Sequence, residues 1–329
     1  MSITRFDLEA AYRRIEELHA RPLPDEPYWY GLGYHLLDLC GLPHTFTLRF
    51  QMHHGPMIDV EAFRMYTESP LPILICHEDF AATLQGHQGR KIMVLGAPQV
   101  RYRRHQAIGQ NADAQGTIAF PCHSTHHIDA EFDHKIYAEQ LRTLPERFQP
   151  VSVCMYALDL LKGRHKPYLE AGLPVFTAGH IADPEFTRRL YGFLRRARFT
   201  TGNEIGTHTI LSLEMGIPYF HSGPQPAFRP GPDAFEHAAM AQQLGRPLLR
   251  PTDYNRPKSA HLRTLIPTAA DDVGISPELA SMVRDVHGCD HAATAEEVRR
   301  FILDAYVSFY PATQTVLRHA RRTGDFFEA

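Results

Sequence analysis

Histidines that follow apolar runs are the residues of this sequence best suited to acid–base chemistry. The chain has 21 His among 329 residues, and two adjacent ones, His53 and His54, follow the apolar run 44–52 and precede Gly55. An imidazole titrates near neutrality, so it can accept the proton of an attacking hydroxyl group. We interpret His54 as the first candidate for a general base, with His53 as the neighbour that could exchange roles with it.

A second polar segment, FPCHSTHHID, ends the apolar run 116–121. The hydroxyls and backbone N–H groups of Ser124 and Thr125 are suited to holding phosphates, and histidines beside them can balance the phosphate charge. The favoured interpretation is a phosphate loop. The alternatives are a structural loop and a metal site, since imidazole and carboxylate ligands follow at short spacing: His123, His126, His127, Asp129 and Asp133. The segment lacks the helical H-E-x-x-H pattern of zinc proteases, and no metal is assigned.

A third constellation is the turn between the apolar run 197–203 and a helix that opens at Thr207. Small residues before a helix N-terminus let backbone N–H groups approach a phosphate, and the helix dipole favours its negative charge. The alternative is an ordinary strand–helix–strand unit that needs glycines at its turns. We predict that a bound nucleotide contacts the polar residues of this turn and of the similar turn after 173–179: Asn203, Glu204, Gly206, Thr207 and His180.

The elements that must position these residues are strands and helices in alternation. Runs of strand length recur along the chain, and several are apolar throughout, which is typical of strands covered on both faces of a parallel sheet. They lie at 44–52, 71–76, 91–98, 116–121, 150–156, 173–179, 197–203 and 217–223. Segments with a helical period separate them at 130–144, 183–197 and 207–215. The alternation predicts doubly wound α/β units.

Domain boundaries are predicted from breaks in this pattern. The polar segment 103–115 has no periodicity, so we place the seam between two α/β domains there. This gives an N-terminal domain over 1–110, a second domain over 111–275, and terminal helices over 276–329 that pack back on the first domain. The stretch 224–272 is rich in Pro, Arg and Asp and is interpreted as an irregular connection.

Composition excludes several classes of protein. With 34 Lys+Arg against 37 Asp+Glu, the formal net charge is -3, which argues against nucleic-acid binding by bulk charge. No apolar stretch approaches the roughly 18 residues of a membrane helix, and the first residues lack a secretory signal. Five scattered cysteines do not form a disulfide framework, so a cytoplasmic protein is expected. The Arg clusters at 188–198 and 318–322 are interpreted as solvated helix faces, with peripheral contact to anionic lipid as the alternative.

Together these features resemble the GT-B glycosyltransferases, especially bacterial capsule, teichoic-acid and lipopolysaccharide transferases. The resemblance rests on the two α/β halves, the turn–helix–Gly-x-Pro–strand element 199–223, the His54–Gly55 pair and the Gly-x-Pro end of a strand at 96–98. It implies two Rossmann-like domains with a C-terminal helix returning to the first. In such enzymes the second half holds a nucleotide-sugar donor and the first binds the acceptor, without a cofactor. Leu211 stands where many of them carry a ribose-binding Glu.

The predicted function is therefore metal-independent, inverting transfer of a sugar from a nucleotide-activated donor to a hydroxyl acceptor, as in the synthesis of surface polysaccharides or glycoconjugates. One alternative is a nucleotide-sugar 2-epimerase of the same architecture, although the G-T-R-P-E-like opening of those enzymes is lacking. Others are a metal-dependent hydrolase that uses the cluster His123–Asp133 and a non-catalytic nucleotide or sugar binder.

Overall fold

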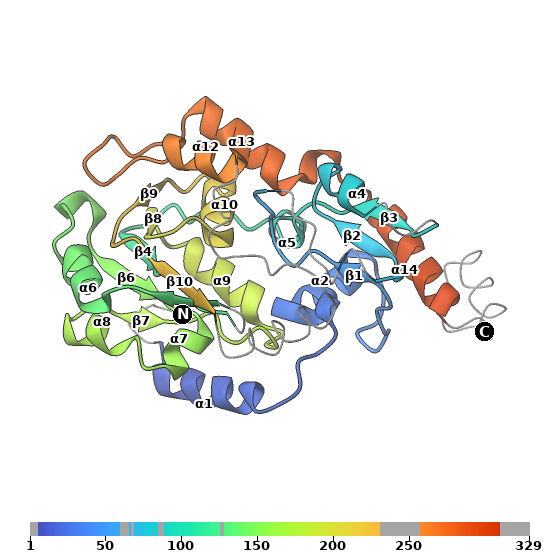
Figure 1. The fold of residues 1–329 in the computed structure, drawn as a ribbon, viewed down its shortest axis with the longest axis horizontal. Coiled ribbons are helices and arrows are strands. Elements are labelled where there is room, and N and C mark those ends of the chain that lie inside the picture. The colour runs from blue at the N-terminus through green and yellow to red at the C-terminus, as the bar shows by residue number, and fades with distance from the viewer. Residues whose placement is uncertain are drawn as a thin grey trace. The chain divides into compact units, whose positions relative to one another are not determined.

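The chain folds into two compact units (Figure 1). The computed structural model describes residues 6–59, 66, 69–84, 89–125, 128–230 and 257–309. Unit 1 comprises Met1–Leu23 and Ile108–Val283, and unit 2 comprises Pro24–Ala107 and Arg284–Ala329. The chain passes between the units after Ala107, inside the segment where the sequence placed a boundary. It passes back within helix α13 (Pro277–His287), eight residues beyond the predicted start of the terminal helices.

Unit 1 is built on a five-stranded parallel sheet in the order β7-β6-β4-β8-β9. Its strands are short and almost wholly buried, as their apolar sequences predict. They are β4 (Thr117–Phe120), β6 (Val151–Cys154), β7 (Val175–Phe176), β8 (Phe199–Gly202) and β9 (Tyr219–His221). A separate antiparallel pair joins β5 (Ile128–Glu131) to β10 (Ala227–Pro230), with Ile128 opposite Pro230.

Helices connect the strands of unit 1. Asp133 caps the first of them, α6, because its carboxylate accepts hydrogen bonds from the backbone N–H groups of Lys135 and Ile136. In Figure 1, α6 lies beside α8, and α1 lies beside α7. The bounds are α1 (Leu8–His19), α6 (His134–Arg142), η3 (Glu146–Phe148), α7 (Ala157–Leu161), α8 (Lys166–Glu170), α9 (Phe186–Leu194), α10 (Thr207–Glu214) and α12 (Pro257–Leu265).

The first helix belongs to unit 1, which differs from the prediction that residues 1–110 form one domain. Ile15 of α1 is 1% exposed, and it packs in one hydrophobic cluster with Tyr137 and Val153. Leu8 and Tyr12 pack against the same cluster. The apolar face seen in the sequence at helical spacing is therefore buried against α6, α7 and β6 rather than against the strands that follow it in the chain.

Unit 2 contains a smaller parallel sheet in the order β1-β2-β3. Its strands are β1 (Gln51–Met52), β2 (Ile73–Ile75) and β3 (Ile92–Val94). The predicted strand 44–52 is shorter than expected, because only its last two residues pair with β2. The helical segments are η2 (Glu26–Gly31), α2 (Leu32–Leu39), α4 (Asp79–Thr83), α5 (Pro98–His105), η5 (Cys289–His291) and α14 (Ala295–Phe309).

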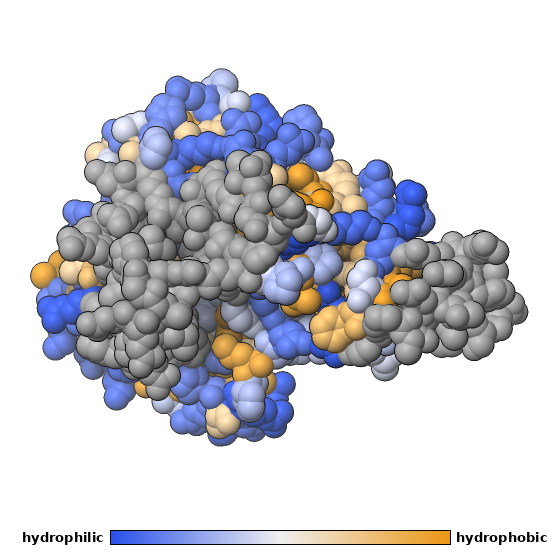
Figure 2. All heavy atoms as spheres, turned by 45° about the vertical axis from the view of Figure 1, so that its right-hand side comes forward, coloured by the Kyte–Doolittle hydropathy of each residue, from blue (hydrophilic) through white to orange (hydrophobic). Residues whose placement is uncertain are grey.

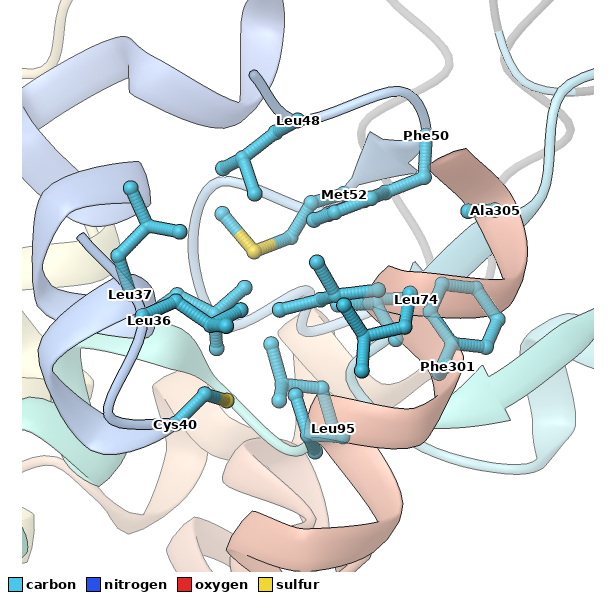
Figure 3. Packing of buried hydrophobic residues seen from close by; sticks show 14 of the residues in the cluster. Leu36, Leu37, Cys40, Leu48, Phe50, Met52, Leu74, Leu95, Phe301 and Ala305 are labelled. Atoms are coloured by element: carbon cyan, nitrogen blue, oxygen red, sulfur yellow. The ribbon is translucent and has the colours of Figure 1, made fainter. Parts of the chain in front are cut away.

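The core of unit 2 joins residues far apart in the chain. Figure 3 shows Leu36 and Leu37 of α2 packed with Met52, Leu74 and Phe301. Phe301 is 1% exposed, and burying a side chain of this kind contributes roughly 1.5–3 kcal/mol to folding. The helix α14 is thus an integral part of unit 2, although about 190 residues separate it from α5. Pro311, where the sequence predicts a kink in the terminal helix, lies outside the described residues.

The predicted α/β fold class is confirmed by the two parallel sheets and the helices between their strands. All five cysteines are free thiols, and four of them are buried. Within the described ranges, every helix is too short or too polar to cross a lipid bilayer. On the face shown in Figure 2, hydrophilic side chains predominate and apolar ones gather in small groups.

Candidate functional site

The strand order of unit 1 places a binding edge between β4 and β8. Numbered along the chain, the five parallel strands stand in the order 3-2-1-4-5, so the connections leave β4 in one direction first and in the other direction later. This defines a doubly wound α/β unit of the Rossmann type. In such units ligands bind beyond the carboxyl ends of the strands at the point where the order reverses, which here is next to Phe120 and Gly202.

Asn203 joins the loops that leave these two strands. Its side-chain oxygen accepts a hydrogen bond from the backbone N–H of Cys122 at 2.7 Å, and its amide nitrogen donates to the carbonyl of Pro224 at 2.8 Å. Asn203 is 1% exposed. The structure thus brings together the loops after β4 and β8, which the sequence predicted separately as parts of the donor site. The side chain of Asn203, which the sequence predicted to contact a nucleotide, is thus hydrogen-bonded to the loops themselves.

Ser124 and Thr125 are also bonded within the protein. The backbone N–H of Ser124 donates to Asp159 at 3.0 Å, and its hydroxyl donates to Asp129 at 2.8 Å and accepts from Arg164 at 2.6 Å. Thr125 closes a tight turn, since its N–H donates to the carbonyl of Ile128 and its hydroxyl accepts from the N–H of Ile128. This differs from the predicted phosphate loop, because the hydroxyl proton of Ser124 and the backbone N–H groups of Ser124 and Thr125 are bonded within the protein.

The carboxylates of the predicted metal alternative belong to an ion-pair network. Asp129 lies 2.8 Å from both Lys162 and Arg164. Burial alone would raise the pKa of Asp129, but the hydrogen bonds from Lys162, Ser124 and Arg164 outweigh it and hold the pKa well below its ordinary range. The carboxylate of Asp133 is already hydrogen-bonded as the N-cap of α6. In the part of the chain that the structure describes, no three His, Cys, Asp or Glu side chains gather in a way that could hold a metal ion.

The start of α10 is the part of this edge that is open to an anion. Gly206 is its N-cap residue, and Thr207, the first helical residue, is exposed. The backbone N–H groups of Thr207 and His208 make no hydrogen bond to any described residue, whereas that of Gly206 donates to the hydroxyl of Thr209 at 3.2 Å. Two unbonded N–H groups at the positive end of a helix form a site for phosphate oxygens.

The side chain of His208 packs against β4 at the same edge of the sheet. Its ring stacks on Phe120 of β4 with centroids 4.9 Å apart, and its Nε2 atom is buried without a hydrogen-bond partner among the described residues. Burial, and to a smaller extent the nearby His123, lower the pKa of His208 to about 3, so the imidazole is neutral at physiological pH. The close approach of this ring also explains Gly202, where an added Cβ atom would lie 3.1 Å from Nε2 and 2.8 Å from the carbonyl oxygen of Phe120.

The other residues predicted for donor binding are placed as follows. Glu204 is ion-paired with Arg263 of α12 and accepts a hydrogen bond from the N–H of Ile205 at 2.8 Å. His123 is exposed and packs against Tyr156 with ring centroids 4.9 Å apart. His180 is 1% exposed, its Nδ1 accepts from the N–H of Ala182, and it packs edge-on against His19. His126, like His127, lies outside the described residues.

The thiol at this edge is not a nucleophile. Cys122 follows β4 and is 9% exposed. Burial, with smaller effects from Glu204 and Asp159, raises its pKa to about 12, so the thiolate is absent at neutral pH.

In unit 2, the two candidate histidines have different environments. His53 is 1% exposed, and its Nδ1 accepts a hydrogen bond from the N–H of Cys76 at 3.3 Å. Burial, with smaller effects from His54, His77 and Arg90, lowers the pKa of His53 to about 3. His54 follows β1 with its side chain 36% exposed. Of the two, His54 is the one whose ring a substrate can reach.

Glu26 is a partner of His54 that the sequence did not indicate. Its carboxylate lies 3.7 Å from Nδ1 of His54 and accepts a hydrogen bond from the hydroxyl of Tyr66. The same hydroxyl lies 3.4 Å from Nδ1 of His54. Burial and the neighbouring carboxylate raise the pKa of Tyr66 well above its ordinary value, so this hydroxyl stays protonated. Glu26 and Tyr66 thus contact Nδ1 and leave Nε2 for a substrate.

Aromatic rings fix the imidazole from the other side. The ring of His54 packs against Trp29 at 5.3 Å and Tyr30 at 5.9 Å between centroids. Both rings come from η2, where Tyr30 has a left-handed backbone (φ 58°). A non-glycine residue in this conformation is uncommon and is often held at a functional site. The signal in the sequence that could have indicated this partner is the acidic residue Glu26 beside the aromatic run Tyr28–Tyr30.

Comparisons with known proteins give similarity at the level of structure. The chain is similar to the crystal structure of AviGT4, a glycosyltransferase involved in avilamycin A biosynthesis, with 14% identity, 81% of this chain and 69% of that chain covered, and a TM-score of 0.29. It is also similar to S. aureus MnaA in a co-structure with UDP, with 9% identity, 94% and 81% covered, and a TM-score of 0.38. No protein-family model matches the sequence. No curated protein matches it.

Proposed function

We propose that this protein is a glycosyltransferase that uses a nucleotide-activated sugar and binds it on unit 1. The observation that carries the proposal is the pair of N–H groups of Thr207 and His208, which make no hydrogen bond to a described residue and begin α10 beside the reversal point of the sheet. Rossmann-type units bind phosphorylated ligands at this position, and the N-terminus of a helix supplies both N–H donors and a favourable field. The proposed ligand group is the diphosphate of the nucleotide.

The loops at this edge of unit 1 are bonded to one another, which suits a site made of backbone groups. Asn203 bonds the loop after β4 to the loop after β8, and Gly202 lets the strand ends approach closely. Neutral His208 packs against β4 without adding charge. The donors therefore keep their positions when a phosphate binds, and no side chain has to be ordered to meet it.

We further propose that His54 of unit 2 is the general base of an inverting transfer. Its Nε2 takes the proton of the acceptor hydroxyl while the acceptor oxygen bonds to the anomeric carbon of the sugar. The bond from that carbon to the phosphate oxygen breaks, and the nucleotide leaves with the electron pair. The N–H groups at the start of α10 stabilise the resulting phosphate charge. Glu26 stabilises the protonated imidazole and holds its orientation.

The experiment that tests donor binding uses two substitutions at Thr207, which is the first residue of α10. Thr207→Pro removes the backbone N–H, and proline is well tolerated at this helical position. Thr207→Val removes the hydroxyl and keeps the N–H. Binding of UDP, GDP, dTDP, CDP and CMP to the full chain would be measured by calorimetry for the parent protein and both variants.

At least one nucleoside diphosphate should bind the parent protein. The proline variant should bind it roughly 10- to 100-fold more weakly, the usual effect of losing one hydrogen bond to a charged group. The valine variant should bind it almost unchanged. The proposal is overturned if no nucleotide binds, or if the proline variant binds as tightly as the parent. Incubation with the corresponding nucleotide sugar alone would then distinguish epimerisation, which needs no acceptor, from transfer.

A further inference from the structure

Unit 1 has a cavity at the opposite edge of its sheet. The cavity has a volume of about 330 Å³ and lies at the amino ends of β4, β6 and β8, where Thr117, Val151 and Ala197 line it. Cavities of this size commonly hold small molecules. None of its lining residues belongs to the carboxyl edge at which the nucleotide is proposed to bind.

Some polar side chains of this cavity have no partner among the described residues. Ser152 is only 8% exposed, and its hydroxyl makes no hydrogen bond to a described residue. The hydroxyl oxygen itself keeps accessible surface, so a molecule in the cavity can reach it. It lines the cavity, so a ligand that enters the cavity can bond to it.

Charged groups at the rim of the cavity also lack ion-pair partners among the described residues. Arg196 is half-buried and forms no ion pair within the described ranges, unlike Arg189 and Arg188 of the same arginine-rich segment, which pair with Asp183 and Glu185. Asp113 also lines the cavity without an ion-pair partner in the described part of the chain. The cavity thus presents one cation and one carboxylate that do not neutralise each other by contact.

The rim is held in place by backbone hydrogen bonds. The N–H groups of Asn111 and Gln115 donate to the carbonyls of Arg195 and Arg196 at 2.7 and 3.0 Å. The side-chain oxygen of Asn111 accepts from Arg195 at 2.7 Å, so its amide nitrogen is left as a donor. The wall also contains Pro150 and Pro174, which offer apolar surface for the C–H face of a sugar ring.

We propose that this cavity is a second ligand site of unit 1, for a monosaccharide that carries an acidic group. The guanidinium of Arg196 binds the carboxylate or phosphate of the ligand. Asp113, Ser152 and the amide nitrogen of Asn111 bind its hydroxyls. The two prolines pack against its ring. The site is separate from the proposed nucleotide site, and its existence does not depend on the transferase activity.

The test measures binding of four probes to the full-length protein by calorimetry: glucuronate, glucose 6-phosphate, glucose and inorganic phosphate. The two acidic sugars distinguish the two sources of the acidic group, and at least one should bind at least tenfold more tightly than glucose or phosphate. Arg196→Gln and Ser152→Val should each weaken that binding, the first at least tenfold. The matched control is Arg198→Gln, which removes the same charge from an exposed residue two positions away that does not line the cavity.

Affinity for UDP should be the same in the parent protein and in Arg196→Gln, so a failed nucleotide assay and a failed sugar assay are distinguishable. Saturating UDP should leave acidic-sugar binding unchanged. The proposal is overturned if neither acidic sugar binds, if phosphate alone binds as tightly as the acidic sugars, or if UDP displaces them. It is also overturned if Arg196→Gln binds them as tightly as Arg198→Gln does.

Discussion

The two units expose different chemical groups at the ends of their strands. In unit 1, side chains such as Ser124 and Asn203 are bonded to the protein itself, and the groups left open are backbone N–H donors at Thr207 and His208. In unit 2, the open group is a side chain, since the ring of His54 is 36% exposed beside a carboxylate. Backbone donors suit the fixed charge of a phosphate, whereas an imidazole suits proton transfer. The difference implies that substitutions in unit 1 change binding and substitutions in unit 2 change rate.

The largest effect is expected from His54→Ala. The rate of sugar transfer should fall about 10²–10⁴-fold, the usual contribution of a general base, while UDP affinity stays unchanged. The matched control is His44→Ala, because His44 is another exposed histidine of unit 2 whose only described ion pair is with Asp38. Full turnover by the His54 variant in a steady-state transfer assay would rule out this residue as the base.

The next effect concerns the packing of strand ends in unit 1. Gly202→Ala would place a Cβ atom 2.8 Å from both the carbonyl oxygen of Phe120 and the hydroxyl of Tyr219. Overpacking of this kind costs about 1–3 kcal/mol of unfolding free energy, and the displaced loop should weaken UDP binding as well. Gly192→Ala is the control, because Gly192 lies inside α9 with nothing within 4 Å of its added Cβ atom. That variant should be unchanged or slightly more stable by denaturant unfolding. Equal stability of the two variants would contradict the close approach at Gly202.

Glu26→Gln should reduce the transfer rate less than the loss of His54 does. The amide keeps an oxygen that can accept from Tyr66 but lacks the charge that stabilises a protonated imidazole, so we expect a loss of roughly tenfold. The reduction should fall on kcat, with donor affinity unchanged, which a merely structural role would not produce. A variant that loses donor affinity and keeps kcat would show that Glu26 does not act through His54.

The smallest effect is a change in acid stability caused by His208. Its folded pKa is lowered to about 3, mainly by burial, so below pH 6.5 the unfolded chain binds a proton that the folded chain does not. The contribution of His208 to the free energy of unfolding is complete at pH values above the pKa of His208 in the unfolded chain. It is lost progressively as the pH falls toward the pKa of His208 in the folded chain. Between pH 6.5 and 5.5 this amounts to about 1 kcal/mol. His208→Phe keeps the stack on Phe120 and should lose correspondingly less stability over that interval. Identical pH slopes in urea unfolding would show that His208 is not buried as a neutral ring.

Much of the fold was predictable because buried parallel strands leave a strong signal. The runs at 71–76, 91–98, 116–121 and 150–156 are mostly apolar and contain β2, β3, β4 and β6. The pair β5–β10 was not predicted, because its strands are polar and lie about 100 residues apart, so no local pattern links them. The placement of α1 in unit 1 was missed for the same reason. A helical period shows that a face is buried but does not show against which partner.

The sequence indicates candidate positions that depend on the order of residues in a short segment. It does not indicate hydrogen bonds and contacts between residues far apart in the chain. The turn before Thr207 and the strand end at His54 are features of short sequence segments. Ser124 is hydrogen-bonded to Asp159 and Arg164, which lie 35 and 40 residues further along the chain. Glu26 reaches His54 across 28 residues. No spacing rule encodes such contacts, and only the folded chain shows them.

Hydrogen exchange in the presence of UDP tests the central claim most directly. The claim is that the N–H groups at the start of α10 bind the phosphates of a nucleotide. With saturating UDP, the peptide that covers residues 203–210 of the full-length protein should exchange at least tenfold more slowly than it does without ligand, since bonded N–H groups are protected. Unchanged exchange of this peptide under conditions where calorimetry shows UDP bound would contradict the claim.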